Sequence, residues 1–251
     1  MISIIFNSYN PTESHERFTR LMVESALTNT KEPLELIAIN KKNSPQFLIY
    51  LKDSGAKILD GIDNDKGYSY AMNRGSEVAQ GEYLTFCDND IVFGHHWDKQ
   101  IIKRLNEDLV AASPNSNTVG NYDYPYGFFV PQNGFNDNDY QRFIEHSKNL
   151  LEVEDDDMGF AGECIVVRKD VAEKIKWDEK YIYGGNDWSL EMQLVENALP
   201  GIRVLYGSNI FHFGHALSNK PPISIKNYGF RSEAEYKYLL PRNYSRDLNV
   251  N

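Results

Sequence analysis

The stretch YLTFCDNDIVF, residues 83–93, ends an apolar run with two carboxylates, Asp88 and Asp90, that have a single asparagine between them. The run before the acids has the length and the aromatic content of a buried strand. Two acids this close repel each other, so the pair indicates either an acidic polar turn or a site that holds a cation. Mg²⁺ and Mn²⁺ prefer oxygen ligands, and each carboxylate can provide one.

The residues before this stretch alternate between strand and helix patterns. Strands are expected at residues 2–6, 34–40, 56–60 and 82–88, and helices at residues 16–27, 45–55 and 70–79. Such alternation is typical of parallel strands joined by crossover helices. We therefore expect the first 110 residues to form a doubly wound α/β sheet. The acidic pair then lies at the carboxyl end of a strand, where open α/β sheets bind their ligands.

The second part of the chain has a less regular pattern. Long loops are expected over residues 115–138 with one candidate strand at 126–131, a helix from 143, a strand and helix over 160–175, a loop and helix over 181–199, and either a strand pair or one interrupted strand over 202–215. No internal repeat or clear linker divides the sequence. One compact domain with a mixed second half is the simplest interpretation.

The composition is ordinary for a soluble protein, with 41% hydrophobic and 25% charged residues. No apolar run approaches the roughly 20 residues that span a bilayer, and the N-terminus lacks the basic stretch of a secretory signal. Cys87 and Cys164 each lie in an apolar run, which favours buried reduced thiols. These features predict no integral membrane segment and a cytoplasmic location.

The charge is distributed unevenly along the chain. The net charge of −10 disfavours indiscriminate binding to nucleic acid, although it does not exclude a local basic patch. Residues 216–251 carry six basic and three acidic side chains, a local charge of 6 − 3 = +3. This tail is either a solvated extension or a lid that meets a phosphate-bearing ligand.

Four segments, in order, resemble the motifs of the family-2 glycosyltransferases. They are ISIIFNSYNP (2–11), NDKGYSYAMNRGSEVAQGEYLTFCDND (64–90), FAGECIVVRKDVAEKI (160–175) and YIYGGNDWSLEMQL (181–194). The resemblance covers about residues 1–218. It implies a GT-A fold, with a catalytic domain over residues 1–215 that has a nucleotide-binding half (1–110) and an acceptor half (111–215). It also implies metal-dependent, inverting transfer of a sugar from a nucleotide diphosphate sugar, a UDP-sugar above all, to an acceptor saccharide or another hydroxyl compound.

The resemblance implies a site for Mn²⁺ or Mg²⁺. By its motif, Asp90 binds the metal directly, and Asp88 faces the donor ribose or the metal and its water shell. A histidine on a late strand is a further ligand in many family members. His212 matches that pattern through its place before Gly214, and His215 is the competing candidate. Because imidazole suits Mn²⁺ less well than carboxylate does, either histidine would be a supporting ligand.

Other residues are expected, by the same resemblance, to contact the nucleotide sugar. They are Asn7, Ser8, Tyr9, Asn40, Asn73 and Arg74. Two of these positions depart from the family pattern. Asn40 stands where the second strand usually ends in an aspartate, and the helix reads AMNRG where Ala-Arg-Asn is common. Both departures bear on the identity of the donor.

The segment GGND points to a catalytic base. The resemblance assigns that role to Asp187, which lies near the start of a helix after two glycines. The helix dipole favours a carboxylate there, and glycines let a loop approach a ligand closely. The alternative for Asp187 is an ordinary acid in the first turn of a helix. Glu163, which follows Gly162, either orients an acceptor hydroxyl or is simply a paired acid.

Two other functions fit parts of the pattern. A nucleotidyltransferase usually has a glycine-rich phosphate loop after its first strand, but residues 7–18 (NSYNPTESHERF) contain no glycine. A non-catalytic module for nucleotide sugars or glycans on the same fold would bind a donor without turnover. Such a module has no need of Asp88, Asp90 and Asp187 together, so their presence argues against it.

Overall fold

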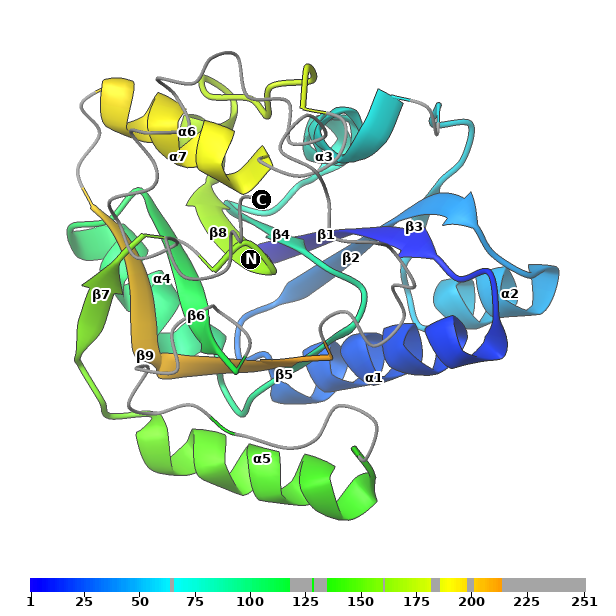
Figure 1. The fold of residues 1–251 in the computed structure, drawn as a ribbon, viewed down its shortest axis with the longest axis horizontal. Coiled ribbons are helices and arrows are strands. Elements are labelled where there is room, and N and C mark those ends of the chain that lie inside the picture. Colours follow the sequence, from blue (N-terminus) through cyan, green and yellow to red (C-terminus); the bar gives the residue numbers. More distant parts are fainter. Residues whose placement is uncertain are drawn as a thin grey trace, which may run out of the picture.

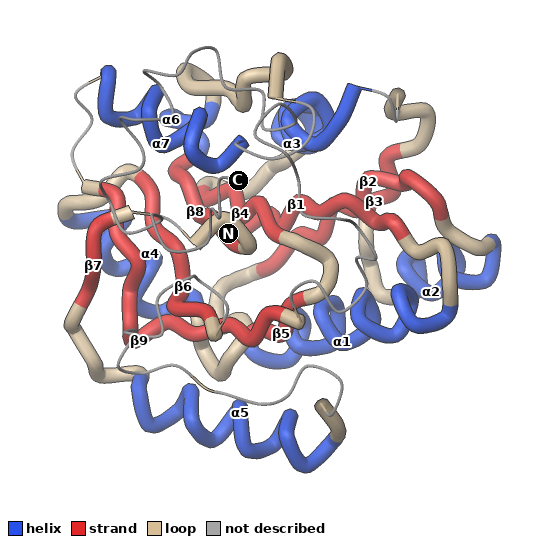
Figure 2. Tube along the Cα trace, in the orientation of Figure 1, coloured by secondary structure: helices blue, strands red, loops and turns tan. Residues whose placement is uncertain are grey.

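The computed structural model describes residues 1–63, 66–117, 128, 135–159, 161–181, 186–197 and 201–213. These residues form one nine-stranded sheet with helices on both sides (Figures 1 and 2). The strands are β1 (Ile2–Tyr9), β2 (Leu34–Lys42), β3 (Lys57–Leu59), β4 (Tyr83–Cys87), β5 (Ile91–Phe93), β6 (Ala111–Ser116), β7 (Asp156–Met158), β8 (Cys164–Arg168) and β9 (Ile202–His212). The helices are α1 (Glu13–Asn29), α2 (Pro45–Asp53), α3 (Gly67–Val78), α4 (Asp98–Glu107), α5 (Asp137–Leu150), α6 (Lys169–Ala172) and α7 (Asn186–Glu196).

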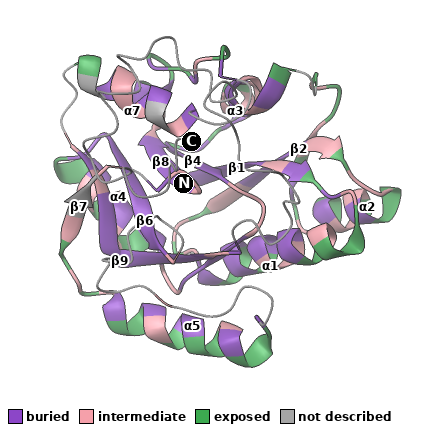
Figure 3. Ribbon diagram, viewed as in Figure 1, coloured by how far each residue is buried: buried purple, intermediate pink, exposed green. Residues whose placement is uncertain are grey.

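The first half of the sheet is parallel, in the order β3-β2-β1-β4. Alternate residues of β1 enter different cores: Ile4 packs with α1 and α2 on one face, whereas Ile5 packs with α3 on the other. Most residues of β1 and β4 and the central residues of β2 are therefore buried on both faces (Figure 3), as crossover helices require. The predicted doubly wound arrangement is confirmed, and the acidic pair follows the carboxyl end of β4 as expected.

The second half of the sheet is mixed. β8 runs antiparallel to both β4 and β6, β6 runs parallel to β9, and both β5 and β7 pair antiparallel with β9. Residues 202–212 form one irregular strand, which settles the choice left open by the sequence. The register with β6 jumps, because Leu205 lies opposite Pro114 whereas Asn209 lies opposite Asn115. β9 therefore bends, and its last residues reach β5 (Figure 1).

Gly207 lies within this irregular part of β9. A Cβ atom there would lie 2.4 Å from the carbonyl oxygen of Val153 and 2.5 Å from the side-chain amide of Gln100. No real Cβ atom tolerates such distances, so the backbone reaches this position only without a side chain. The bend in β9 is what carries His212 to the first residue of β5, Ile91.

Several element boundaries differ from the sequence expectation. α3 begins at residue 67 rather than 70, α5 at 137 rather than 143, and β8 at 164 rather than 160. α5 begins early because Asn136 and Asp139 form a capping box. The Asn136 side chain accepts from the Asp139 backbone N–H, and the Asp139 side chain accepts from the Asn136 backbone N–H. β5, α4, β6 and β7 have no counterpart in the sequence expectation, and β6 includes residues 115 and 116, for which the sequence predicts loop.

Other expectations fall outside the described residues. These include the candidate strand at 126–131, of which only residue 128 is described, and the basic tail. Cys87 and Cys164 are buried free thiols, as predicted, and they are cross-strand neighbours in the β4–β8 pair. Within the described part of the chain, no helix combines the length and the apolar character that a membrane span requires.

Candidate active site

The residues between β4 and β5 form a short turn that is fixed at both ends. The backbone N–H of Asp88 donates to the carbonyl oxygen of Glu163 (2.9 Å), and the N–H of Phe213 donates to the carbonyl oxygen of Asp90 (2.9 Å). Asn89, between the two acids, donates instead to Thr19 Oγ1 of α1 (2.7 Å). The turn is therefore held by three separate elements, and both carboxylates are free to face the same space.

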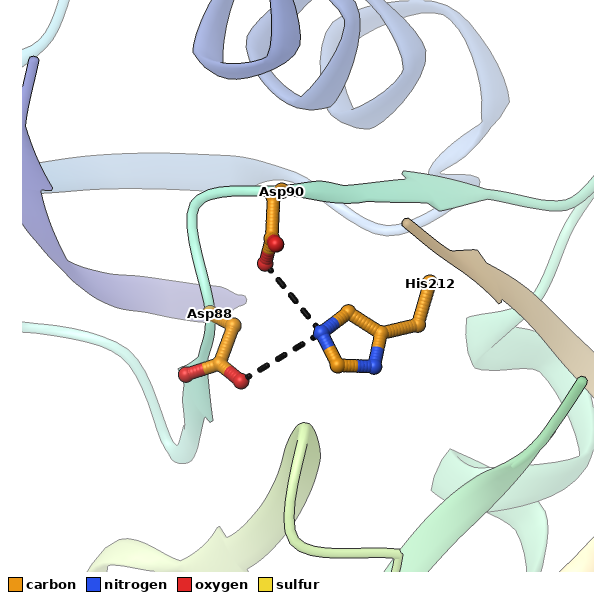
Figure 4. Close-up of side chains that lie close together, drawn as sticks. All are labelled: Asp88, Asp90 and His212. Atoms are coloured by element: carbon orange, nitrogen blue, oxygen red, sulfur yellow. Dashed lines mark ion pairs between the residues drawn. The ribbon is translucent and has the colours of Figure 1, made fainter. Parts of the chain in front are cut away.

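That space also contains the ring of His212 (Figure 4). Its Nε2 atom lies 3.2 Å from Asp90 Oδ1 and 3.7 Å from Asp88 Oδ2. The ligand atoms of these three side chains all lie within 4.8 Å of one another. Asp88 is the most open, with 40% of its side chain exposed, against 17% for Asp90 and 13% for His212.

The electrostatics of this cluster favour a positive charge beside the acids. Loss of hydration and the neighbouring Asp90 carboxylate raise the pKa of Asp88 to about 7. Burial alone would lower the pKa of His212, but hydrogen bonds to Asp90 and Glu163 outweigh it and hold the pKa well above its usual range. The raised pKa favours the protonated ring beside the two acids. Two carboxylate oxygens and one imidazole nitrogen are a donor set that suits a divalent cation.

Asp187 lies in the first turn of α7, beside the loop that leads into β8. A Cβ atom added to Gly162 would lie only 2.5 Å from Asp187 Oδ2, so the carboxylate packs directly against the backbone of that glycine. The charge of Asp187 contributes to the raised pKa of Asp88, after the larger effects of burial and Asp90. The structure therefore brings Asp187 to the edge of the carboxylate–histidine cluster, whereas His215 lies outside the described residues.

The predicted donor-binding residues of β1 lie where the strand passes the end of β4. Asn7 is one residue beyond the last β1–β4 pair, Phe6 and Cys87. Asn7 Oδ1 is buried and has no hydrogen-bond partner among the described residues. Ser8 Oγ donates to Asn43 Oδ1 (3.0 Å), and Tyr9 is 49% exposed. All three thus lie at the same edge of the sheet as the acidic pair.

Asn40 lies farther along this edge, in β2. Its side chain donates to Asp60 Oδ1 (2.6 Å) and accepts from Asn43 Nδ2 (2.6 Å). Asp60, just after β3, therefore places a carboxylate beside the position where the family motif usually has one. No sequence motif singles out Asp60, because only the pairing of β2 with β3 brings it to Asn40.

Asn73 and Arg74 contact the second half of the chain. Asn73 Nδ2 donates to the carbonyl oxygen of Trp177 (2.9 Å) and to Glu179 Oε1 (2.9 Å), while its Oδ1 accepts from the N–H of Trp177 (3.0 Å). Arg74 forms an ion pair with Glu77 (2.6 Å). The contacts of Asn73 fix the 177–179 segment against α3, and its predicted contact with the donor stays a prediction.

Three further residues border the site, and of these the sequence analysis considers only Glu163, as an acid that either orients an acceptor hydroxyl or is simply paired. The Asn117 side chain accepts from the backbone N–H of His212 (2.6 Å) and donates to its carbonyl oxygen (3.1 Å). Glu163 Oε1 lies 3.3 Å from His212 Nδ1. Burial and the charge of Asp88 raise the pKa of Tyr68 well above its usual range, which places Tyr68 near the acids. Only Glu163 had a local signal, its place after Gly162 in a family motif.

Comparison with known proteins identifies the family of this chain. Residues 3–176 match the model of glycosyl transferase family 2, so the chain belongs to that family. Glucosyl-dolichyl phosphate glucuronosyltransferase of Haloferax volcanii is 30% identical over 115 residues, which are 44% of this chain and 36% of the relative. The uncharacterized glycosyltransferase YibD of Escherichia coli is 31% identical over 119 residues, 46% of this chain and 33% of YibD. The matched regions thus span about a third of each relative's length.

Solved structures agree on the fold. The crystal structure of GalNAc-T7 with UDP, GalNAc and Mn²⁺ matches with a TM-score of 0.63 at 16% sequence identity. The match covers 95% of this chain and 47% of that protein. Together with the mixed α/β sheet, it shows the GT-A fold that the sequence resemblance implied.

Proposed function

We propose that this chain transfers a sugar from a nucleotide diphosphate sugar, a UDP-sugar above all, to the hydroxyl group of a saccharide or another acceptor, with inversion at the anomeric carbon. The observation that carries the proposal is the meeting of Asp88, Asp90 and His212 beside Asp187. They meet at the carboxyl end of β4, the edge at which open α/β sheets bind ligands. Membership of glycosyl transferase family 2 supports the reaction class.

The donor would lie along the edge formed by β1, β2 and β4. Asn7, Ser8 and Tyr9 would line the nucleotide pocket, with Asp88 as the most exposed acid beside them. Asn7 Oδ1 supports this placement, because it is a buried acceptor with no partner among the described residues. Leaving such an acceptor unpaired costs about 1–3 kcal/mol. A hydroxyl or N–H group of the bound nucleotide sugar would donate the hydrogen bond. Asn40, Asn73 and Arg74 complete the predicted donor set.

Asp88, Asp90 and His212 would hold a divalent cation, Mn²⁺ or Mg²⁺. Such an ion stabilises negative charge that develops on a diphosphate leaving group. The side chains suit this task because the ring of His212 lies against both carboxylates while 40% of Asp88 stays accessible. Asp88 could therefore contact both the ion and the donor without a change in the backbone.

Asp187 would act as the general base. Its carboxylate accepts the proton of the acceptor hydroxyl as that oxygen bonds to the anomeric carbon, and the bond from that carbon to the diphosphate breaks on the opposite face. A positioned base contributes about 10²–10⁴-fold to the rate. The contact with the Gly162 backbone supports this role, because it holds the carboxylate in place at a position where no other side chain fits.

Two features of the whole chain belong to the same proposal. Residues 1–215 would form the catalytic domain, and the basic residues of 216–251 would close over the diphosphate. A cytoplasmic location follows from the two reduced cysteines and stays a prediction.

The proposal is tested by a screen of nucleotide sugars, with and without Mn²⁺, read by release of the nucleotide diphosphate. Wild type is expected to turn over at least one UDP-sugar only when metal is present. Asp187→Asn is expected to bind the same donor with unchanged affinity while turnover falls about 10²–10⁴-fold. Full turnover in this variant would remove the base assignment.

The same screen examines the main alternative. A module that binds nucleotide sugars without chemistry would show donor-dependent thermal stabilisation but no turnover against a broad panel of acceptors. If neither stabilisation nor turnover occurs with any nucleotide diphosphate, the donor site is placed wrongly.

A further inference from the structure

Glu163 contacts the side of His212 that faces away from the acidic pair. Its Oε1 atom lies 3.3 Å from His212 Nδ1, while His212 Nε2 faces Asp90 Oδ1 at 3.2 Å. Each nitrogen of one imidazole ring is therefore next to a carboxylate. The side chain of Glu163 is only 13% exposed, as is that of His212, so this contact is shielded from solvent.

We infer that Glu163 positions His212 as a metal ligand, an inference that rests on the metal site in the proposed function. A neutral imidazole carries one N–H and one lone pair. If Nδ1–H is donated to Glu163, the lone pair is on Nε2, the nitrogen that faces Asp88 and Asp90. Metal-binding histidines commonly depend on such a carboxylate, which fixes the tautomer and the ring orientation.

The backbone around this contact is fixed as well. The carbonyl oxygen of Glu163 accepts the N–H of Asp88 (2.9 Å), so the positioning acid and one candidate ligand share a hydrogen bond. On the other side, Asn117 contacts both the N–H and the carbonyl oxygen of His212. Hydrogen bonds thus hold the backbone at both Glu163 and His212. The His212 ring can still rotate about its side-chain bonds, and the contact with Glu163 restricts that rotation.

The geometry also separates this role from two others. A direct metal ligand would be expected beside Nε2, but Glu163 contacts the opposite nitrogen and is not part of the set whose ligand atoms lie within 4.8 Å. A residue that orients the acceptor would need access to it, whereas 87% of the Glu163 side chain is shielded, the complement of its 13% exposure. Glu163 therefore acts through His212.

The test measures Mn²⁺ affinity directly, by electron paramagnetic resonance titration of the full-length protein without donor or acceptor. Glu163→Ala is expected to weaken Mn²⁺ binding about 10–100-fold. Glu163→Gln, whose amide oxygen can still accept the Nδ1–H, is expected to recover part of that loss. Glu154→Gln is the matched control, since Glu154 is 78% exposed and pairs only with Lys103 in the described structure. Its affinity should equal that of wild type.

A double-mutant cycle then distinguishes positioning from direct ligation. In a His212→Ala background, Glu163→Ala should have no further effect on Mn²⁺ affinity. A full additional loss would show that Glu163 binds the ion itself, and an unchanged affinity in the single variant would overturn the inference. If wild type binds no Mn²⁺ at all, the metal site of the proposed function fails together with it. Thermal unfolding of each variant confirms that the affinities belong to folded protein.

Discussion

The two halves of the sheet bring side chains to the site in different ways. In the first half, parallel strands end at a common edge, so Asn7 and Asp88 arrive there simply because β1 and β4 are neighbours in register. In the second half, His212 arrives only because β9 changes register with β6 and bends to β5. The first half thus provides positions that follow from local strand order, and the second half provides positions that depend on long-range irregularities.

The two halves also contribute different residues to the site. Asp88 and Asp90 come from one short turn of the first half, whereas Glu163, Asp187 and His212 come from three separate segments, namely the turn before β8, α7 and β9. The comparison leads to four predictions about what each half contributes.

The largest effect is expected from the acidic turn. Asp90→Ala removes a carboxylate whose oxygen lies 3.2 Å from His212 Nε2, and Mn²⁺ affinity should fall by more than about 100-fold, beyond the loss typical of an outer-shell partner. His212→Ala should cost less, because Mn²⁺ prefers oxygen to nitrogen. Titration of both variants gives the ranking. A larger loss for His212→Ala would make the second half the main source of the site.

The second prediction concerns the contact between Gly162 and Asp187. A Cβ atom at residue 162 would lie 2.5 Å from Asp187 Oδ2, so Gly162→Ala must displace the carboxylate. Turnover should fall about 10²-fold, the cost of a misplacement of roughly 1 Å, while Mn²⁺ affinity changes little. The control is Gly162→Ala with Asp187→Asn, in which the alanine should cost nothing more. A drop in Mn²⁺ affinity of the single variant would instead indicate a shift of Glu163.

The sequence was sufficient where the structure follows from local pattern. The apolar run before Asp88 predicts a strand that ends at the acidic pair. The preceding alternation of strands and helices predicts that this end lies at the carboxyl-terminal edge of the parallel strands. A motif favours His212 over His215. The structure places His212 beside Asp88 and Asp90, but His215 lies outside the described residues, so the choice between them stays a prediction. The meeting of His212 with the two acids needed the β9–β5 pairing, which no local spacing reveals.

The contacts that the sequence could not provide all join distant segments. Asn117 lies in a stretch of asparagines that reads as loop, yet it holds the backbone of His212. Asn73 matched a family motif, but its hydrogen bonds go to Trp177 and Glu179. In each case the residue type is informative about hydrogen bonding and uninformative about the partner, because the partner is chosen by the fold.

The third prediction is a pH dependence of metal binding. The pKa of Asp88 is raised to about 7 and that of His212 is raised as well, so in the metal-free protein both hold protons that a cation must displace. Affinity for Mn²⁺ should therefore rise with pH, by about tenfold per unit for each displaced proton below pH 7.

The free energy of unfolding of the metal-free protein should change with pH in the opposite direction. A raised carboxyl pKa stabilises the metal-free fold at low pH, and that contribution is lost as pH rises toward 7.

Binding isotherms at pH 6, 7 and 8 check the third prediction, with Asp88→Asn as the comparison, because an amide has no proton to displace and its slope should be shallower. Equal slopes for the two proteins would assign the dependence to another group. Thermal melts in the presence of a chelator over the same range check the sign for stability.

The smallest effect on activity is expected from Asn73, through which the first half contacts residues 177–179 of the second half. Asn73→Ala leaves the Trp177 N–H without its acceptor, and the free energy of unfolding should fall by about 1–3 kcal/mol. Ser76→Ala is the matched control on the same helix, since Ser76 Oγ donates only to Met72 of its own helix in the described structure, and it should cost less.

Denaturant melts give the free energy of unfolding of both variants, and the affinity for UDP decides whether Asn73 contacts the donor. If Asn73 contacts the donor as its motif implies, UDP affinity falls beyond what the folded fraction explains. If its contacts with residues 177–179 are its whole role, UDP affinity per folded molecule is unchanged, and the first half contributes its donor contacts from strand ends alone.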